Sequence, residues 1–200
     1  SIASIIVAML APFLGAIADR GTAKKKFLFI FAFLGIVMTG GLWMVAQGFW
    51  QMAILLYVLA TVGFSGGNLF YDSLLPGIAS EEKVDFVSSL GFALGYVGGG
   101  ILFLINVLMY LQPDTFGIPD GATAIRLSFV TVAIWWAVFS IPVALWVKEP
   151  VIYEAVGIGS AVGLGWKQLS ETLKEIRHLR VVGLFLLAYW LYIDGVDTIV

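Results

Sequence analysis

Long stretches of apolar residues follow one another along this chain, separated by short polar connectors. A run of about 20 mostly apolar residues is long enough to cross the roughly 30 Å hydrocarbon core of a bilayer as a helix. Within these runs the apolar residues fall on all sides of a helix, and they do not alternate as in the strands of an outer-membrane barrel. The pattern therefore predicts an all-α, polytopic membrane helix bundle. The six predicted spans are residues 1–18, 27–46, 52–71, 86–111, 125–147 and 181–200.

The composition indicates that lipid is the main solvent. Apolar residues make up 60% of the chain and charged residues 12%, whereas roughly a quarter of an average soluble protein is charged. The net charge of −2 leaves no basic surface for nucleic acid. The chain has no cysteine, so disulfides and thiolate chemistry are excluded within it. We expect the lipid bilayer to surround most of the chain.

The basic residues predict the orientation, because Lys and Arg in short loops collect on the cytoplasmic side. Ten of the eleven basic residues lie in alternate connectors, and the two connectors between them contain none. The eleventh is Arg126, at the outer mouth of the fifth predicted span. We therefore expect the basic connectors on the cytoplasmic side. They are residues 19–26, 72–85 and 148–180.

The longest connector divides the chain into three regions. It contains an amphipathic stretch in which Trp166, Leu169 and Leu173 share one face, so we expect a helix along the inner membrane surface. Because both ends of the chain fall within predicted spans, we expect an internal fragment of a larger protein. The regions are residues 1–147, an N-terminal transmembrane bundle lacking its first helix; residues 148–180, a cytoplasmic linker; and residues 181–200, the first helix of a C-terminal bundle.

The first informative motif crosses the end of the first span. Residues 15–26 read GAIADRGTAKKK. This segment resembles the loop signature of the major facilitator superfamily, G-x-L-A-D-R-x-G-R-K, although its basic run begins late, at Lys24. The resemblance implies a conformational motif formed by Gly15, Asp19, Arg20 and Lys24, in which the acid at the span boundary holds one conformation shut. A simple positive-inside loop would explain the lysines but not the acid.

The second motif comprises residues 68–79, NLFYDSLLPGIA, and the glycine-rich helix of residues 91–100. Together they resemble the vacuole-effluxer-like branch of the same superfamily, related to autophagy-associated amino-acid exporters. Gly91, Gly95 and Gly99 recur at spacings of four, which predicts a groove without side chains into which another helix packs. Tyr96 stands where an antiporter signature would have proline, which weakens an interpretation as an antiporter.

The third motif is the last span, in which two acids interrupt an apolar helix. Trp190, Asp194 and Asp197 share one helix face, and Tyr189 lies beside it. A carboxylate at the bilayer centre costs about 2.5–3.5 kcal/mol, so both acids should face protein or water. We expect this face to line the substrate or proton pathway, with Asp194 and Asp197 holding protons. The alternative is that Asp197 caps an outer helix end in solvent and that only Asp194 is buried.

These observations favour a secondary transporter that works by alternating access. The resemblance covers about the second to the seventh of some twelve helices. It implies a partial major facilitator fold, and proton-coupled export of a small polar metabolite such as an amino acid. We expect a monomer whose partners are the lipid bilayer and a small-molecule solute. We expect no cofactor other than the proton, and a multi-pass location in the bacterial cell (inner) membrane.

A membrane-embedded scaffold or lipid-modifying enzyme is the alternative. The chain carries no soluble-enzyme motif, and its acidic loop, with Glu81, Glu82 and Asp85, lacks the histidine that metal-dependent lipid chemistry would need. The only histidine, His178, has no second His or Cys nearby, so no metal site is expected. We therefore expect a protein that is not an enzyme.

Overall fold

The structure is a computed structural model. It describes residues 24–149 without a gap, together with isolated residues and short runs on either side. The further described residues are 6, 7, 10, 11, 13–15, 18, 163, 166, 167, 170, 184, 185, 188 and 191.

Four long α-helices and three short 3₁₀ turns make up the continuous part. No residue of the described part forms a strand, which confirms the all-α prediction there. The helices are α2 (Lys24–Gly41), α3 (Trp50–Leu74), α4 (Val84–Leu111) and α5 (Gly121–Trp146), and the turns are η1 (Leu42–Met44), η2 (Leu75–Gly77) and η3 (Pro113–Phe116).

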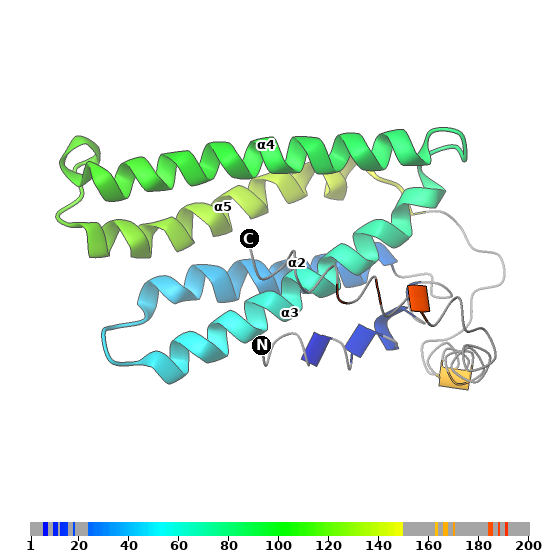
Figure 1. Cartoon of the computed structure of the whole chain (residues 1–200), viewed down its shortest axis with the longest axis horizontal. Coiled ribbons are helices and arrows are strands. Elements are labelled where there is room, and N and C mark those ends of the chain that lie inside the picture. Colours follow the sequence, from blue (N-terminus) through cyan, green and yellow to red (C-terminus); the bar gives the residue numbers. More distant parts are fainter. Residues whose placement is uncertain are drawn as a thin grey trace.

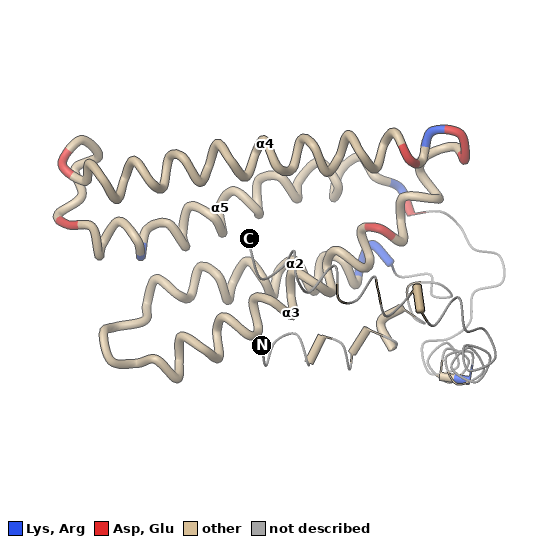
Figure 2. The backbone as a smooth tube through the Cα atoms, viewed as in Figure 1, with Lys and Arg blue, Asp and Glu red and all other residues tan. Residues whose placement is uncertain are grey.

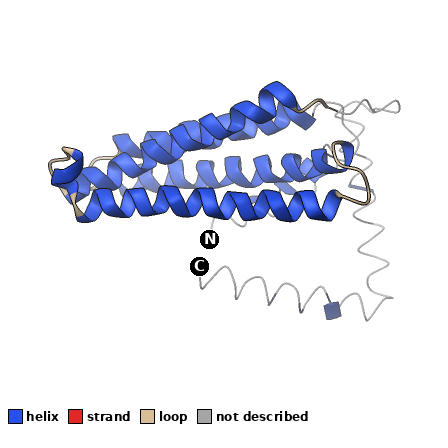
Figure 3. Ribbon diagram, turned by 90° about the horizontal axis from the view of Figure 1, so that it is seen from above, coloured by secondary structure: helices blue, strands red, loops and turns tan. Residues whose placement is uncertain are grey.

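The four helices run along a common direction, and each is antiparallel to the next (Figures 1 and 3). α2 packs along α3 and also against α5, while α4 packs against α5. α3 and α4 meet chiefly through η2 and the short loop that follows it. The bundle thus has a tight group of α2, α3 and α5, with α4 attached on the α5 side.

The four helices match four of the predicted spans, but each helix starts earlier than its predicted span. Each observed helix begins two to four residues before the predicted span, at positions 24, 50, 84 and 121 against 27, 52, 86 and 125. At the starts of α2 and α5, groups outside the helix bind backbone N–H groups that lack partners within it: Glu149 accepts from Lys24, and Asp120 accepts from Thr123. The predicted first and last spans fall largely outside the described residues.

Charged side chains collect at the two ends of the bundle, and the long middle section is uncharged (Figure 2). We call one end the lysine end, defined by Lys24–Lys26, Lys83 and Lys148. The other is the arginine end, defined by Arg126. Each of the four helices is long and apolar enough to cross a bilayer, and many large apolar side chains, such as Phe103, are exposed. The chain is therefore part of a multi-pass membrane protein.

Glycine allows α2 to approach both of its neighbours closely. A Cβ atom at Gly63 of α3 would lie only 2.5 Å from the backbone nitrogen of Gly35 in α2. A Cβ atom at Gly35 would lie 2.2 Å from the indole ring of Trp136 in α5. Small residues at such crossings are the usual means of packing membrane helices. Gly35 thus marks the point where α2, α3 and α5 meet.

At the arginine end, α4 is joined to α5. Met109, Ile118 and Ala124 form a small buried cluster around η3. Asp120 is the N-cap of α5, since its carboxylate accepts a hydrogen bond of 2.7 Å from the Thr123 N–H. This hydrogen bond from the backbone lowers the pKa of Asp120 below its usual value. The cap fixes the start of α5 and so the position of α4 beside it.

Candidate functional site

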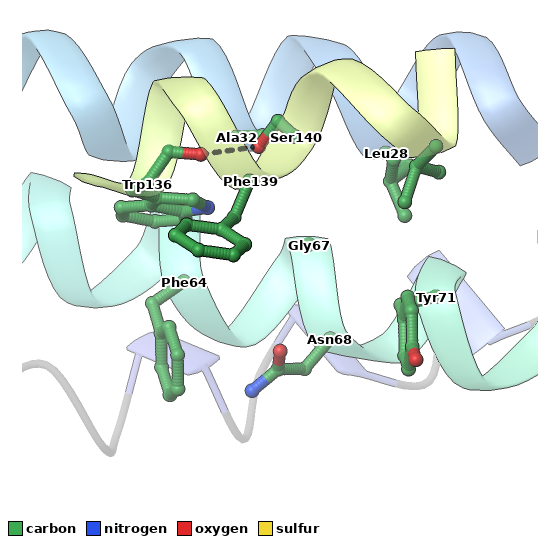
Figure 4. Close-up of a pocket in the computed structure, with 10 residues that line it drawn as sticks. Leu28, Ala32, Phe64, Gly67, Asn68, Tyr71, Trp136, Phe139 and Ser140 are labelled. Atoms are coloured by element: carbon green, nitrogen blue, oxygen red, sulfur yellow. Dashed lines mark hydrogen bonds between the residues drawn. The ribbon is translucent and has the colours of Figure 1, made fainter. Parts of the chain in front are cut away.

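One face of α3 carries a strip of polar and aromatic side chains. Tyr57, Thr61, Phe64, Asn68 and Tyr71 follow one another at spacings of four and three, which places them on one side of the helix. The labelled side chains of Phe64, Asn68 and Tyr71 lie along this side of α3 in Figure 4. We call these five residues the α3 strip. It runs along most of the length of a membrane-spanning helix.

Three cavities border the α3 strip. The first, of about 190 Å³, lies between α3, α2 and α5 and is drawn in Figure 4. Phe64 borders all three cavities, and Asn68 and Tyr71 border two of them. The cavities therefore adjoin one another along α3. The first is lined by Leu28, Ala32, Phe64, Gly67, Asn68, Tyr71, Trp136, Phe139, Ser140 and Val143.

The second cavity, of about 480 Å³, lies between α3 and α4 toward the lysine end. Its polar groups are the side chains of Asn68, Tyr71, Asp72 and Ser88. They offer hydrogen-bond donors, acceptors and one carboxylate. Aromatic rings and glycines complete the walls, which are Phe64, Leu75, Gly91, Phe92, Gly95 and Tyr96.

The third cavity, of about 760 Å³, lies nearer the arginine end and is bordered by all four helices. Seven of its fifteen lining residues are aromatic, and the Phe64 and Trp136 rings meet edge to face with centroids 6.0 Å apart. Asn106 on its wall accepts a hydrogen bond of 2.9 Å from Thr131. The remaining members are Thr39, Leu42, Tyr57, Ala60, Thr61, Gly99, Leu102, Phe103, Phe129, Val132, Trp135 and Phe139.

The side chains that line the three cavities are suited to binding a small solute. Amide and hydroxyl groups can exchange hydrogen bonds with a polar solute, and aromatic rings can pack against its apolar parts. The described residues around the α3 strip bring together no nucleophile, base and orienting group of the kind that covalent catalysis requires.

The comparison with known families decides the identity of the chain. The family described as "Vacuole effluxer Atg22 like" matches residues 1–85 and 79–200, which together cover the whole chain. The chain belongs to this family. The resemblance predicted from the two motifs of residues 15–26 and 68–79 is thereby confirmed.

Individual relatives of this Atg22-like chain come from bacteria and fungi. It is 39% identical to "Uncharacterized MFS-type transporter YxiO" of Bacillus subtilis, over 100% of this chain and 46% of the relative. It is 24% identical to "Autophagy-related protein 22-1" of Penicillium rubens, over 100% of this chain and 45% of the relative. The chain thus spans about half the length of these relatives. No solved structure matches it.

The residues predicted for the substrate or proton pathway of this Atg22-like protein lie outside the described residues. These are Tyr189, Trp190, Asp194 and Asp197. Their pathway role stays a prediction.

The conformational motif is described in part. Asp19 and Arg20 lie outside the described residues, and no atom of the described structure lies within 4 Å of a Cβ built at Gly15. Lys24 begins α2, and its ammonium donates a 3.2 Å hydrogen bond to the backbone carbonyl of Ser73 at the end of α3. Lys24 therefore ties two helix ends together, while the role of the motif in conformational change stays a prediction.

The three predicted packing glycines face the cavities. Within the described residues, a Cβ atom at Gly95 or Gly99 would meet nothing within 4 Å, and one at Gly91 would meet only the Tyr71 hydroxyl, at 3.4 Å. Gly91 and Gly95 border the second cavity and Gly99 borders the third. Helix packing at these positions remains a prediction. The close approach of helices that the structure does describe occurs instead at Gly35 and Gly63.

Sequence reasoning missed the α3 strip as a site. The motif of residues 68–79 supported the family assignment, but Asn68 and Tyr71 were not assigned a role. The available signal was the regular spacing of polar and aromatic residues from Tyr57 to Tyr71 in an otherwise apolar span. An intramembrane polar residue is a functional candidate because burying it in lipid is unfavourable.

Proposed function

We propose that the full-length protein is a secondary active transporter that works by alternating access. The observation that carries this proposal is the α3 strip, which presents polar and aromatic groups to three adjoining cavities within an apolar bundle. Membership of an effluxer family supports the same function. The proposed solute is a small polar metabolite such as an amino acid, and the proposed direction is export.

The α3 strip would guide a polar solute across the bilayer. In the hydrocarbon core the solute would lose its hydrogen bonds to water, which is strongly unfavourable. Asn68 and Tyr71 supply replacement partners, while the aromatic rings of Phe64 and Trp136 pack against apolar parts of the solute. Rocking of this bundle against a second one, which residues 181–200 would begin, would expose the strip to each side in turn.

Proton coupling is the second part of the proposal. It rests on the sequence of the last span, where Asp194 and Asp197 share a face with Trp190 and lie next to Tyr189. A carboxyl group held in apolar surroundings favours its protonated form, so such a group can gain and release a proton during transport. The proton would be the only coupling ion, with no further cofactor.

The proposed setting completes the function. We propose that the protein lies in a bacterial cell (inner) membrane. The identity of 39% to the Bacillus relative, against 24% to the Penicillium one, supports this location. The segment with Gly15, Asp19, Arg20 and Lys24 would stabilise one conformation of the transport cycle. We expect the protein to act as a monomer.

Flux in proteoliposomes tests the proposed function. The full-length protein should move at least one amino acid of a radiolabelled panel, and an imposed pH gradient should accelerate that flux several-fold. Asp194→Asn keeps the shape of the side chain but cannot exchange a proton, so it should abolish the acceleration. An unchanged acceleration in Asp194→Asn would contradict the coupling role, and the absence of protein-dependent flux for every solute of the panel would contradict the transport function.

A further inference from the structure

Helices α2 and α5 are fastened to each other at the arginine end. Arg126 lies in the second turn of α5, and its guanidinium contacts Trp43 in η1, the turn that directly follows α2. Its Nε and Nη2 atoms donate hydrogen bonds of 2.9 and 2.6 Å to the backbone carbonyl of Trp43. The guanidinium carbon also lies 4.8 Å from the centre of the Trp43 ring, within the range of a cation–π interaction. Arg126 thus satisfies a carbonyl that the end of a helix leaves unpaired.

The same arrangement recurs at the lysine end with the two helices exchanged. Lys25, in the first turn of α2, donates hydrogen bonds of 2.7 Å each to the carbonyls of Ala144 and Val147, at the end of α5. In return, the Glu149 carboxylate just beyond α5 accepts a hydrogen bond from the backbone N–H of Lys24. Cations at helix C-termini and anions at helix N-termini are both favourable for the helix dipole.

Between these ends the two helices remain in contact. A Cβ atom at Gly35 would overlap the Trp136 ring, and one at Gly40 would lie 3.4 Å from the Cβ atom of Ala133. α2 and α5 are therefore in contact along their middle sections and are joined by side-chain hydrogen bonds at both ends. Each helix contributes one basic residue near its own start, which binds the carbonyls at the end of its antiparallel neighbour.

We propose that Lys25 and Arg126 are reciprocal end caps that fasten α2 and α5 into one unit, and that this unit keeps its geometry during the transport cycle. The constant geometry of the unit rests on the proposed function, whereas the end caps do not. The proposal also explains Arg126, the one basic residue of positions 24–149 that lies away from the lysine end, because its position is set by the carbonyl that it binds.

Thermal unfolding of the full-length protein in detergent tests the caps. Lys25→Gln and Arg126→Gln should each lower the melting temperature by at least about 3 °C. Lys26→Gln is the matched control, because it removes the same charge from the neighbouring position. The Lys26 side chain is exposed and has no hydrogen bond or ion pair with the described residues. Equal shifts for Lys25→Gln and Lys26→Gln, or no shift for Arg126→Gln, would overturn the caps.

A disulfide then distinguishes fastening from any other role of Arg126. Native disulfides place Cβ atoms about 3.5–4.5 Å apart, and the Gly40–Ala133 pair comes close to that range in a chain that has no cysteine of its own. In the oxidised Gly40→Cys/Ala133→Cys protein, Arg126→Gln should lose most of its effect on the melting temperature. A full effect of Arg126→Gln in the cross-linked protein would show that it does not act by holding the two helices together.

Flux through the same cross-linked variant tests whether the α2–α5 unit keeps its geometry during the transport cycle. Oxidised and reduced Gly40→Cys/Ala133→Cys proteins should transport at rates within about twofold of each other, because the pair does not change its geometry. Loss of flux on oxidation and its recovery on reduction would overturn the rigid unit. If neither form nor the wild type transports any solute, the proposed function and the rigid unit in transport fail together. The melting temperatures still test whether Lys25 and Arg126 act as end caps.

Discussion

Replacing Gly63 by alanine should strongly destabilise the bundle. The new Cβ atom would lie 2.5 and 2.7 Å from the backbone nitrogen and Cα of Gly35, and 2.8 Å from the carbonyl oxygen of Phe31. All three are backbone atoms of α2, so no side-chain rotation relieves the overlap, and α2 and α3 must move apart. Overpacking of this kind costs about 1–3 kcal/mol, and we expect the upper end of that range.

Two matched glycines give this prediction its controls. At Gly66 the new methyl group would meet the Phe31 ring at 2.5 Å, and a side chain can move, so the effect of Gly66→Ala should be intermediate. Gly100→Ala meets nothing within 4 Å in the described structure and should be neutral. The measurement is the melting temperature and monodisperse yield of the three full-length variants in detergent. Wild-type behaviour of Gly63→Ala would show that α2 and α3 are not packed backbone to backbone.

Replacing Asn68 by leucine should reduce solute flux by about tenfold or more without unfolding the protein. Leucine has the same number of side-chain heavy atoms and the same branching as asparagine, but neither its donors nor its acceptor. A polar solute group left without a partner in an apolar site costs about 1–3 kcal/mol, and each 1.4 kcal/mol corresponds to about tenfold. Asn68 borders two of the three cavities, so a passing solute would meet it in both.

The control for Asn68→Leu is Gln51→Leu. Gln51 is an exposed amide in the first turn of the same helix and borders none of the three cavities described above. Both variants are reconstituted at equal protein amounts, and their initial rates of flux are compared with that of the wild type. Equal rates for Asn68→Leu and Gln51→Leu would remove the α3 strip from the transport path.

The fold was largely predictable because lipid imposes a simple rule. A segment that crosses the bilayer must be long, helical and apolar on all sides, and four predicted spans are confirmed by α2, α3, α4 and α5. The starts of the helices were less predictable. Lys24 and Lys25 looked like loop residues, but they form the first turn of α2 because their partners, Ser73, Ala144 and Val147, lie far away in sequence.

The candidate site was harder to predict because it also depends on contacts between residues far apart in the sequence. Hydropathy identifies the span that contains Asn68 and Tyr71, but it does not show which side of the helix remains uncovered by its neighbours. That depends on the packing of α2 against α3 through Gly35 and Gly63, and on the attachment of α4 to α5. Arg126 illustrates the same limit: in the sequence it is only an exception to the orientation rule, whereas in the structure it donates two hydrogen bonds to the Trp43 carbonyl.

The most direct test of alternating access uses a cysteine at position 68. Asn68→Cys is placed in the full-length protein, with any cysteine outside this chain replaced, and is exposed to a membrane-impermeant maleimide from either side of the membrane. Alternating access along α3 predicts labelling from both sides, with an added transported solute raising one rate and lowering the other. Labelling from one side alone under all conditions, or from neither side, would contradict a path along α3 that opens to each side in turn.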